Sequence, residues 1–207
     1  MFKQKTLLVT GGTGSFGNAV LRRFLKTDIA QIRIFSRDEK KQDDMRHDYR
    51  DSKLKFYIGD VRQLDSLQEA MSGVDFVFHA AALKQVPSCE FYPMEAIRTN
   101  ALGADNVLQA ALDNRIKRVV VLSMDKAAYP INAMGLTKAL MEKLMVARSR
   151  VAAEKGLVFC GSRYGSVMAS SALFATTSNS QGLRAGLLPG WDANRGLERR
   201  YCTAFCM

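Results

Sequence analysis

The feature that most constrains the fold of this chain is a glycine-rich stretch near its amino terminus. Residues 7–17 read LLVTGGTGSFG, in which an apolar run ends at Thr10 and a helical pattern begins after the last glycine. The stretch predicts a strand, a tight turn and a helix, in which Gly11 turns the chain, Gly14 admits a pyrophosphate and Gly17 allows close packing. The N–H groups at the start of such a helix favour an anionic phosphate. The alternative is a glycine turn without a ligand.

Strand and helix patterns alternate along most of the chain. Strands are predicted near 6–10, 31–35, 54–58, 75–79, 118–122 and 157–162, and helices near 15–26, 38–49, 63–71, 93–114 and 134–154. This alternation predicts an α/β, doubly wound parallel sheet with helices on both faces. The glycine turn after the first strand favours the strand order 3-2-1-4-5-6 of a dinucleotide-binding (Rossmann) domain over residues 1–168. Residues 169–207 lack a period and are rich in Ser, Gly, Thr and Ala, which predicts a poorly structured tail.

The charge of the chain limits the classes of partner. Its 207 residues carry a net charge of +10, but the basic residues alternate with acidic ones, as in RDEKKQDDMRHDYRD, which favours a solvated helix face over a nucleic-acid surface. Positive charge also suits a nucleotide-sugar substrate. Four cysteines without a CxxC pair, and two histidines, predict no metal site. No apolar stretch is long enough to span a bilayer and no signal peptide is evident, so we expect a cytoplasmic protein without a membrane partner.

The end of the second predicted strand bears on the choice of cofactor. An acidic residue there binds the ribose 2′-hydroxyl of NAD, whereas an arginine accommodates the 2′-phosphate of NADP. The chain reads Ser36-Arg37-Asp38, with Lys40 and Lys41 close behind. This pattern favours NADP over NAD, and Asp38 alternatively caps the next helix.

The ends of the third and fourth predicted strands supply further candidates for the cofactor cleft. Asp60 and Val61 are both candidates for cofactor binding, and Asp60 either accepts a hydrogen bond from the adenine amine or caps the helix near 63–71. The fourth strand runs into Ala80 and Ala81, whose small side chains leave room for a cofactor. His79, which ends that strand, is interpreted as a packed histidine rather than a catalyst.

The fifth predicted strand delivers Ser123-Met124-Asp125-Lys126 to the carboxyl edge of the sheet, where such folds bind ligands. The adjacent acid and amine, Asp125 and Lys126, can divide proton transfers between them. The alternative is an exposed ion pair of little energetic value. Met134 and Lys138 follow one helical turn apart on one face of the next helix.

Four segments together resemble the extended short-chain dehydrogenase/reductase superfamily: TGGTGSFG, HAAALKQVP, SMDKAAYPINAMGLTK and RYGSV. They are most similar to the inverting UDP-N-acetylglucosamine 4,6-dehydratases of bacterial capsule, O-antigen and flagellin-sugar synthesis, over residues 1 to about 169. The nearest subgroup also inverts C5 and has Met in place of the usual Tyr of YxxxK, as Met134 and Lys138 stand here. The resemblance implies a lyase and a homo-oligomer that associates through the helices near 93–114 and 134–154.

The family chemistry implied by this resemblance assigns roles to single residues. The sugar is oxidised at C4, loses the C5 proton and the C6 hydroxyl, and is reduced at C6, so that the cofactor is regenerated. Lys126 is then the C5 base and Asp125 the acid for the departing hydroxyl, while Lys138 holds the nicotinamide ribose. A lysine acts as a base only if its pKa is lowered, for example by burial. Met134 cannot exchange protons.

The resemblance also implies binding residues around these groups. The diphosphate lies at the turn of Thr13, Gly14, Ser15 and Phe16, the adenosine phosphate at residues 36–41, the rest of the cofactor along Ala80, Ala81, Lys84 and Ser123, and UDP-N-acetylglucosamine near Lys84, Arg163, Tyr164 and Ser166. Lys84 is alternatively a surface lysine. Asn100, in the helical region after the fourth strand, is expected to order the site.

The sequence departs from the family pattern in three places. Met124 stands where Thr is usual, and Ser166 stands where Asn is usual. After about Ala169 the family continues into a substrate-binding region, whereas this chain has its aperiodic tail. We expect that tail to be out of frame and the chain to be a truncated dehydratase. The alternatives are a non-catalytic NADP-binding remnant or interaction module, and a UDP-sugar 4-epimerase, whose reaction loses no water.

Overall fold

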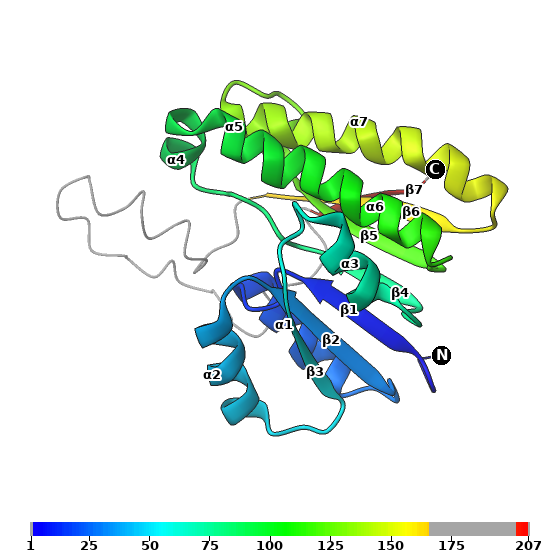
Figure 1. The fold of residues 1–207 in the computed structure, drawn as a ribbon. Coiled ribbons are helices and arrows are strands. Elements are labelled where there is room, and N and C mark those ends of the chain that lie inside the picture. Colours follow the sequence, from blue (N-terminus) through cyan, green and yellow to red (C-terminus); the bar gives the residue numbers. More distant parts are fainter. Residues whose placement is uncertain (1, 166–201, 207) are drawn as a thin grey trace, which may run out of the picture.

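The computed structural model describes residues 2–165 and the backbone of residues 202–206. Strands in these ranges form one sheet in the order β3-β2-β1-β4-β5-β6-β7 (Figure 1). The strands are β1 (Thr6–Thr10), β2 (Gln31–Ser36), β3 (Leu54–Ile58), β4 (Phe76–His79), β5 (Arg118–Met124), β6 (Val158–Tyr164) and β7 (Cys202–Cys206). The first six are parallel to one another. The predicted strand order 3-2-1-4-5-6 is therefore confirmed.

The helices cover both faces of the sheet. They are α1 (Ser15–Leu25), α2 (Glu39–Tyr49), α3 (Leu64–Met71), α4 (Val86–Phe91), α5 (Pro93–Ala96), α6 (Gly103–Asp113) and α7 (Ala133–Glu154), with a π-helical segment η1 (Ile97–Leu102) and a 3₁₀ turn η2 (Asp125–Ala127). Helices α3, α6 and α7 lie on one face, and α1 and α2 lie on the other (Figure 1). The segments α5, η1 and α6 follow without a break and account for the predicted helix at 93–114.

The core explains why the central strands read as apolar runs rather than as alternating patterns. On β1, the side chain of Leu8 packs with the layer of α3, α6 and α7, while those of Leu7 and Val9 pack with the layer of α1 and α2. Leu8 and Val9 have no exposed surface. Successive side chains of a strand point to opposite faces, so a strand between two helical layers has to be apolar throughout.

Helix α4, strand β7 and the 3₁₀ turn η2 were not predicted. Helix α4 has six residues, which is too short for a helical period to be visible. Strand β7 pairs antiparallel with β6 at the edge of the sheet, within the segment that was expected to be a poorly structured tail. The rest of that expected tail, and Ser166, lie outside the described residues. In the part of the chain that the structure describes, no helix is long and apolar enough to cross a membrane.

Candidate functional site at the carboxyl edge of the sheet

The glycine turn between β1 and α1 has the geometry that the sequence predicted. Gly11 has a φ of +65°, and a Cβ there would lie 2.7 Å from the backbone nitrogen of Ala81. A Cβ on Gly17 would lie 2.5 Å from the Cα of Gly12. Gly14 differs, because its Cβ would meet only the Gly11 carbonyl oxygen, at 3.3 Å. Gly11 and Gly17 are thus required by packing, whereas Gly14 leaves an open approach to the backbone.

This open approach fits a dinucleotide phosphate. Gly14 and Ser15 are exposed, and Gly14 is the N-cap residue of α1. The first N–H groups of a helix have no partner within the helix, so those of Ser15 and Phe16 are suited to bind an anion. Asn18 closes the inner side of the turn, since its amide donates to the carbonyls of Thr13 and Gly14. The residues present therefore fit the diphosphate of a nicotinamide cofactor.

Phe16 connects the glycine turn to strands β4 and β6. Its ring stacks on that of Phe78 in β4, with centroids 5.7 Å apart, and on that of Tyr164 at the end of β6, 5.5 Å away. Burial raises the pKa of Tyr164, and the negative charge of Asp125 adds to this effect. Phe16, predicted for the cofactor, and Tyr164, predicted for the substrate, are therefore in direct contact.

The region predicted for the adenosine phosphate lies between β2 and α2. The hydroxyls of Thr13 and Ser36 are 2.9 Å apart. Asp38 accepts a hydrogen bond from the backbone N–H of Lys41 and pairs with its Nζ at 2.9 Å, so the capping interpretation of Asp38 is confirmed. The side chain of Arg37 keeps 54% of its surface exposed. Arg37 is therefore an accessible cation at the position where a 2′-phosphate is expected.

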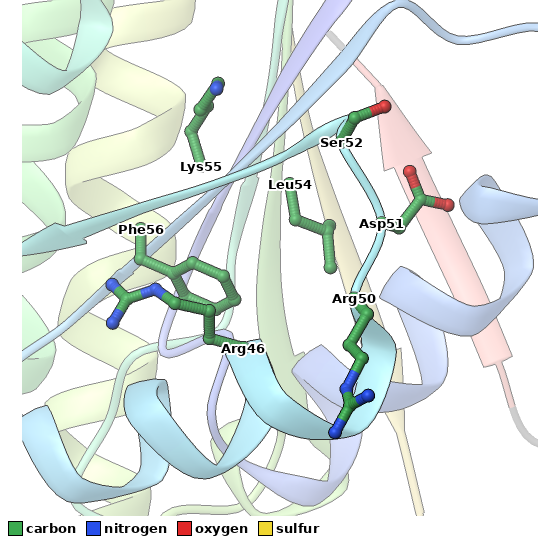
Figure 2. Close-up of a pocket in the computed structure, with 7 residues that line it drawn as sticks. All are labelled: Arg46, Arg50, Asp51, Ser52, Leu54, Lys55 and Phe56. Atoms are coloured by element: carbon green, nitrogen blue, oxygen red, sulfur yellow. The ribbon is translucent and has the colours of Figure 1, made fainter.

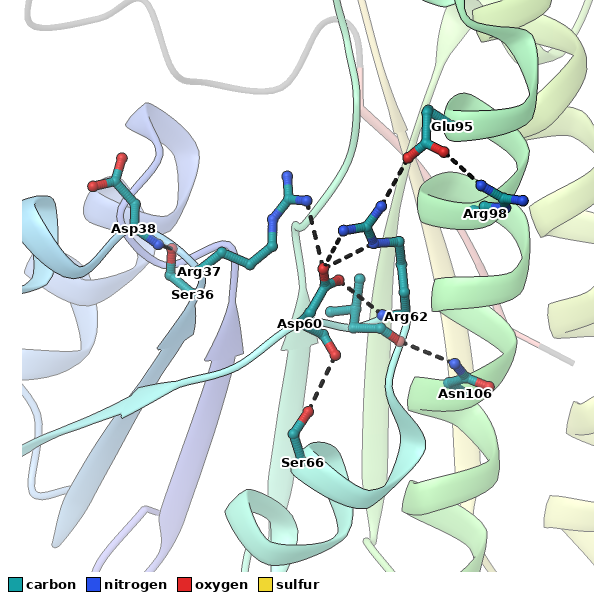
Figure 3. Close-up of polar contacts among 10 residues, drawn as sticks. Ser36, Arg37, Asp38, Asp60, Arg62, Ser66, Glu95, Arg98 and Asn106 are labelled. Atoms are coloured by element: carbon teal, nitrogen blue, oxygen red, sulfur yellow. Dashed lines mark hydrogen bonds and ion pairs between the residues drawn. The ribbon is translucent and has the colours of Figure 1, made fainter.

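Asp60 lies opposite Arg37 and is held by a neighbouring arginine (Figure 3). Its carboxylate accepts hydrogen bonds from the backbone N–H and the Nε of Arg62, and Arg37 approaches it to 3.5 Å. Burial alone would raise the pKa of Asp60, but these hydrogen bonds and positive charges bring it below its usual value. Helix α3 begins after Gln63 without a side-chain cap. The capping alternative for Asp60 is therefore wrong, and its contact with adenine stays a prediction.

Val61 lies in the core rather than on an open surface. It is 5% exposed, and a Cβ on Gly103 of α6 would come within 2.8 Å of its side chain. Its carbonyl oxygen accepts a hydrogen bond from Asn106, also on α6 (Figure 3). Val61 therefore joins the loop after β3 to α6. Its neighbour Asp60 is the residue whose carboxylate faces Arg37.

The end of β4 and the segment after it combine a neutral histidine, His79, with an exposed lysine, Lys84. His79 is buried, its Nδ1 lies 2.7 Å from the Thr10 hydroxyl, and no partner among the described residues meets its Nε2. Burial lowers the pKa of His79 to about 3, helped by the charge of Lys138. The interpretation of His79 as a packed strand-end residue is confirmed. Ala80 and Ala81 lie against the glycine turn, and Lys84 is exposed.

Asn100 orders this segment, as expected. It lies on η1 and has no exposed surface. Its side chain accepts a hydrogen bond from the N–H of Leu83 and donates to the carbonyl of the same residue, and it also donates to Thr137 of α7. Asn100 therefore ties the loop that carries Lys84 to the helix that carries Lys138.

Asp125 and Lys126 form η2, directly after β5. Their side chains keep 51% and 40% of their surface exposed, and Lys126 Nζ lies 3.8 Å from the Asp125 carboxylate. The Asp125 carboxylate also accepts the backbone N–H of Lys126. A Cβ on Gly135 would lie 2.6 Å from the Lys126 carbonyl, so α7 packs tightly beneath this pair. The acid and amine are together, but the burial that a lysine base requires is not present.

Met134 and Lys138 both lie buried on α7, one turn apart. Met134 packs with Cys89 and Ala96. Lys138 Nζ donates to the Leu122 carbonyl at 3.0 Å. Burial lowers the pKa of Lys138 to about 8, and the negative charge of Glu142 opposes that change.

Sequence reasoning missed Glu142, which joins two of the predicted site residues. Its carboxylate accepts a hydrogen bond from the Ser123 hydroxyl and two from the Arg163 guanidinium. Ser123 is 1% exposed, so its hydroxyl is directed to Glu142 rather than to an open cleft. The spacing of Lys138 and Glu142, four apart on one helix, is the sequence signal that indicates a shared face.

A cavity elsewhere in the fold is separate from this site. It has a volume of about 540 Å³ and lies where α2 ends and β3 begins. Its lining residues are Arg46, Arg50, Asp51, Ser52, Leu54, Lys55 and Phe56 (Figure 2). The site residues follow the carboxyl ends of the strands, whereas this cavity lies at an amino end. The Arg46 guanidinium stacks on the Phe56 ring, and the Lys55 side chain points away from that ring (Figure 2). These cations are therefore not directed at one common point in the cavity.

A family model for polysaccharide biosynthesis proteins matches residues 7–175 of this chain. The chain belongs to this family. Two curated relatives, both named UDP-glucose 4-epimerase, come from Rickettsia felis and Rickettsia prowazekii and are 68% and 67% identical over 174 residues. The match covers 82% of this chain and 51% of each relative, so the chain spans about half the length of the curated relatives it matches.

Solved structures with a similar fold include sugar-nucleotide enzymes. Pen from Bacillus thuringiensis is 37% identical, with a TM-score of 0.80 over 83% of this chain and 53% of that protein. The UDP-Glc/GlcNAc 4-epimerase of Campylobacter jejuni is 19% identical, with a TM-score of 0.69 over 87% of this chain and 59% of that protein. The second likeness shows the shared fold alone.

Proposed function

We propose that this chain takes part in the nicotinamide-dependent conversion of a UDP-sugar for polysaccharide biosynthesis, and that the reaction is the 4,6-dehydration of UDP-N-acetylglucosamine. The observation that carries the proposal is the pairing of accessible Asp125 and Lys126 next to a buried Met134. Dehydration needs a base for the C5 proton and an acid for the C6 hydroxyl, and these two side chains supply both. Because the chain spans about half of its relatives, the proposal concerns the activity of that longer architecture.

The cofactor of the proposed reaction is NADP rather than NAD. The glycine turn leaves Gly14 open to a diphosphate, and Arg37 offers an exposed guanidinium beyond β2. The Asp38 carboxylate already accepts the N–H of Lys41 as the cap of α2 and pairs with the Nζ of the same residue. A guanidinium binds phosphate in a bidentate manner, which supports the preference for a 2′-phosphate.

The protein groups divide the remaining work by their positions. When bound, the cofactor supplies the oxidation at C4 and the reduction at C6. The Asp125 carboxylate takes the proton of the C4 hydroxyl as C4 is oxidised and passes it to the departing C6 hydroxyl. Lys126 takes the C5 proton that the C4 ketone has made acidic and returns a proton to C5 when C6 is reduced. Lys126 needs a covering wall to lose its hydration, since 40% of its side chain is exposed. Lys138, fixed on the Leu122 carbonyl, holds the nicotinamide ribose.

UDP-sugar 4-epimerisation is the second candidate, and the names of the curated relatives favour it. An epimerase oxidises C4 and returns hydrogen to the opposite face, so it needs proton transfer only at the C4 hydroxyl. Met134 has no proton to exchange, and it is 1% exposed. In epimerisation Asp125 would serve the C4 hydroxyl, as it also does in dehydration, and Lys126 would have no role.

Product analysis separates these functions. The purified chain is incubated with NADP or NAD and with UDP-N-acetylglucosamine or UDP-glucose, and the products are examined by mass spectrometry and NMR. A product lighter by one water, with a C4 ketone, supports dehydration. A product of unchanged mass with inverted C4 supports epimerisation instead. Cofactor binding without turnover by this chain identifies a cofactor-binding module. If a chimera that adds the carboxyl-terminal half of the Rickettsia felis relative also turns over neither sugar, the proposed catalysis is overturned.

We also propose that the chain forms a homo-oligomer through η1 and α7. Three leucines on these adjacent elements, Leu102, Leu136 and Leu140, are 52%, 56% and 47% exposed. Exposed apolar side chains gathered on neighbouring helices mark an interface. Light scattering coupled to size-exclusion chromatography is expected to give a mass above that of one chain, and Leu140→Glu is expected to shift it toward the monomer. A monomeric wild type contradicts this assignment.

A further inference from the structure

Two side chains of α7 reach across to the ends of β5 and β6. Lys138 Nζ donates to the Leu122 carbonyl, 3.0 Å away. One turn further along, Glu142 accepts hydrogen bonds from Ser123 of β5 and Arg163 of β6. Glu142 is therefore a single carboxylate that joins one helix to two strands.

Glu142 and Arg163 form a two-bonded ion pair in which the Glu142 side chain is largely buried. Nε and one terminal nitrogen of the guanidinium approach the two carboxylate oxygens separately, which is the bidentate arrangement that fixes both planes. The Glu142 side chain is 10% exposed. Burial would raise the pKa of Glu142, but the hydrogen bonds from Arg163 and Ser123 lower it, so the carboxylate is charged. Removing either partner would leave a buried charge unpaired, which strongly destabilises a fold.

The groups that Glu142 holds stand directly beside the proposed chemistry. Ser123 lies in β5, two residues before Asp125, the first residue of η2. Arg163 precedes Tyr164, whose ring stacks on Phe16 of the glycine turn. A shift of Ser123 or Arg163 would therefore move the acid–base pair or the aromatic contact relative to Lys138.

We infer that Glu142 is a positioning residue: by holding Ser123 and Arg163 it sets the spacing between Lys138, the Asp125–Lys126 segment and Tyr164. The inference rests on the proposed function, because these three groups matter together only in a nicotinamide-dependent sugar enzyme. It also makes Arg163 a support for the site, in place of the substrate contact that the sequence predicted.

The test compares two variants that each weaken a bidentate ion pair on α7. Glu142→Gln removes the charge at the site. Asp105→Asn does the same to the pair of Arg148 with Asp105 of α6, whose nitrogen–oxygen distances are 2.7 and 2.8 Å. Calorimetric titration of each full-length variant with NADP and NAD, at a temperature where both are folded, gives the affinities. Glu142→Gln is expected to weaken binding about tenfold, and Asp105→Asn less than about twofold. Equal losses in both variants would show a general stability effect and overturn the inference.

A double-variant cycle separates positioning from direct contact. If Arg163 acts through Glu142, Arg163→Gln lowers the affinity in the wild-type background and has no further effect in the Glu142→Gln background. Additive losses would mean that Arg163 contacts a ligand independently, which contradicts the inference.

Hydrogen exchange tests the inference without any cofactor. Glu142→Gln is expected to speed amide exchange in residues 122–127 and 163–165, whereas Asp105→Asn leaves those segments unchanged. Unchanged exchange in Glu142→Gln overturns the inference. A wild-type chain that binds neither NADP nor NAD overturns the proposed function instead, and the exchange result still decides the role of Glu142.

Discussion

The buried face of α7 and the exposed η2 turn lie next to each other but hold their charges in opposite ways. Measured over the whole residue, Lys138 and Glu142 are 6% and 7% exposed, and each has partners on β5 or β6. Asp125 and Lys126 keep about half of their surface, 51% and 40%, and lie 3.8 Å apart. The buried charges are therefore positioned by the fold, whereas the exposed pair is placed only by its backbone and gains little from its own attraction.

This difference separates the groups that carry the proposed chemistry from those that hold it in place. Loss of a buried partner leaves an uncompensated charge and costs stability. Loss of an exposed carboxylate costs little stability, so an effect on turnover would report chemistry alone. The two regions can thus be distinguished by measuring stability and activity on the same variants.

The largest expected effect is on turnover by the exposed pair. Asp125→Asn keeps the shape of the side chain but cannot protonate the departing hydroxyl. We expect dehydration to fall by at least about 100-fold, with the melting temperature and the NADP affinity of the wild type. Full activity in this variant would remove Asp125 from the mechanism.

The next effect is on stability and concerns the buried face. Glu142→Ala leaves the Arg163 guanidinium and the Ser123 hydroxyl without their carboxylate. We expect the free energy of unfolding in urea to fall by about 3 kcal/mol. The matched Asp125→Ala variant should lose less than about 0.5 kcal/mol. If both lose the same amount, the contrast between the two regions fails.

A smaller effect is expected at the glycine turn. Gly11→Ala combines a φ of +65° with a Cβ 2.7 Å from the Ala81 backbone, whereas Gly73, at φ +71°, has nothing within 4 Å of its Cβ position. Gly73→Ala therefore measures the conformational cost alone, about 1 kcal/mol. Gly11→Ala is expected to cost about 2 to 3 kcal/mol in chemical denaturation, together with a loss of NADP binding. Equal losses of unfolding free energy in the two variants would mean that the loop at Ala81 moves to accommodate the added Cβ.

Per pH unit, the smallest effect is the pH dependence that His79 gives to the free energy of unfolding. Its pKa is about 3 in the folded chain and 6.5 in its ordinary state, so below pH 6.5 the unfolded chain binds a proton that the folded chain does not. Stability is present above pH 6.5 and is lost as the pH falls toward 3. The loss from this group is roughly 1.4 kcal/mol per pH unit. His79→Gln should flatten the stability curve by that amount between the two values, and an unchanged slope would contradict the burial of a neutral imidazole.

Particular residues show how far sequence reasoning reaches. Gly11, Gly17 and the capping role of Asp38 could be predicted, because each depends on a turn or a helix end only a few residues long. Asp60 could not be decided, since its carboxylate is engaged by Arg62 and approached by Arg37 across two loops. Val61 was assigned to the cofactor, but its side chain is taken up by α6.

The sequence by itself determined the alternation of strands and helices, the glycine turn and the strand order, because these follow from local periodicity and from the handedness of parallel connections. Only the tertiary structure decided which polar groups are partners. Ser123, Glu142 and Arg163 lie far apart along the chain and meet because β5 and β6 are neighbours beneath α7. Pairing of this kind depends on burial and on distances between elements, and no periodicity within one segment encodes it.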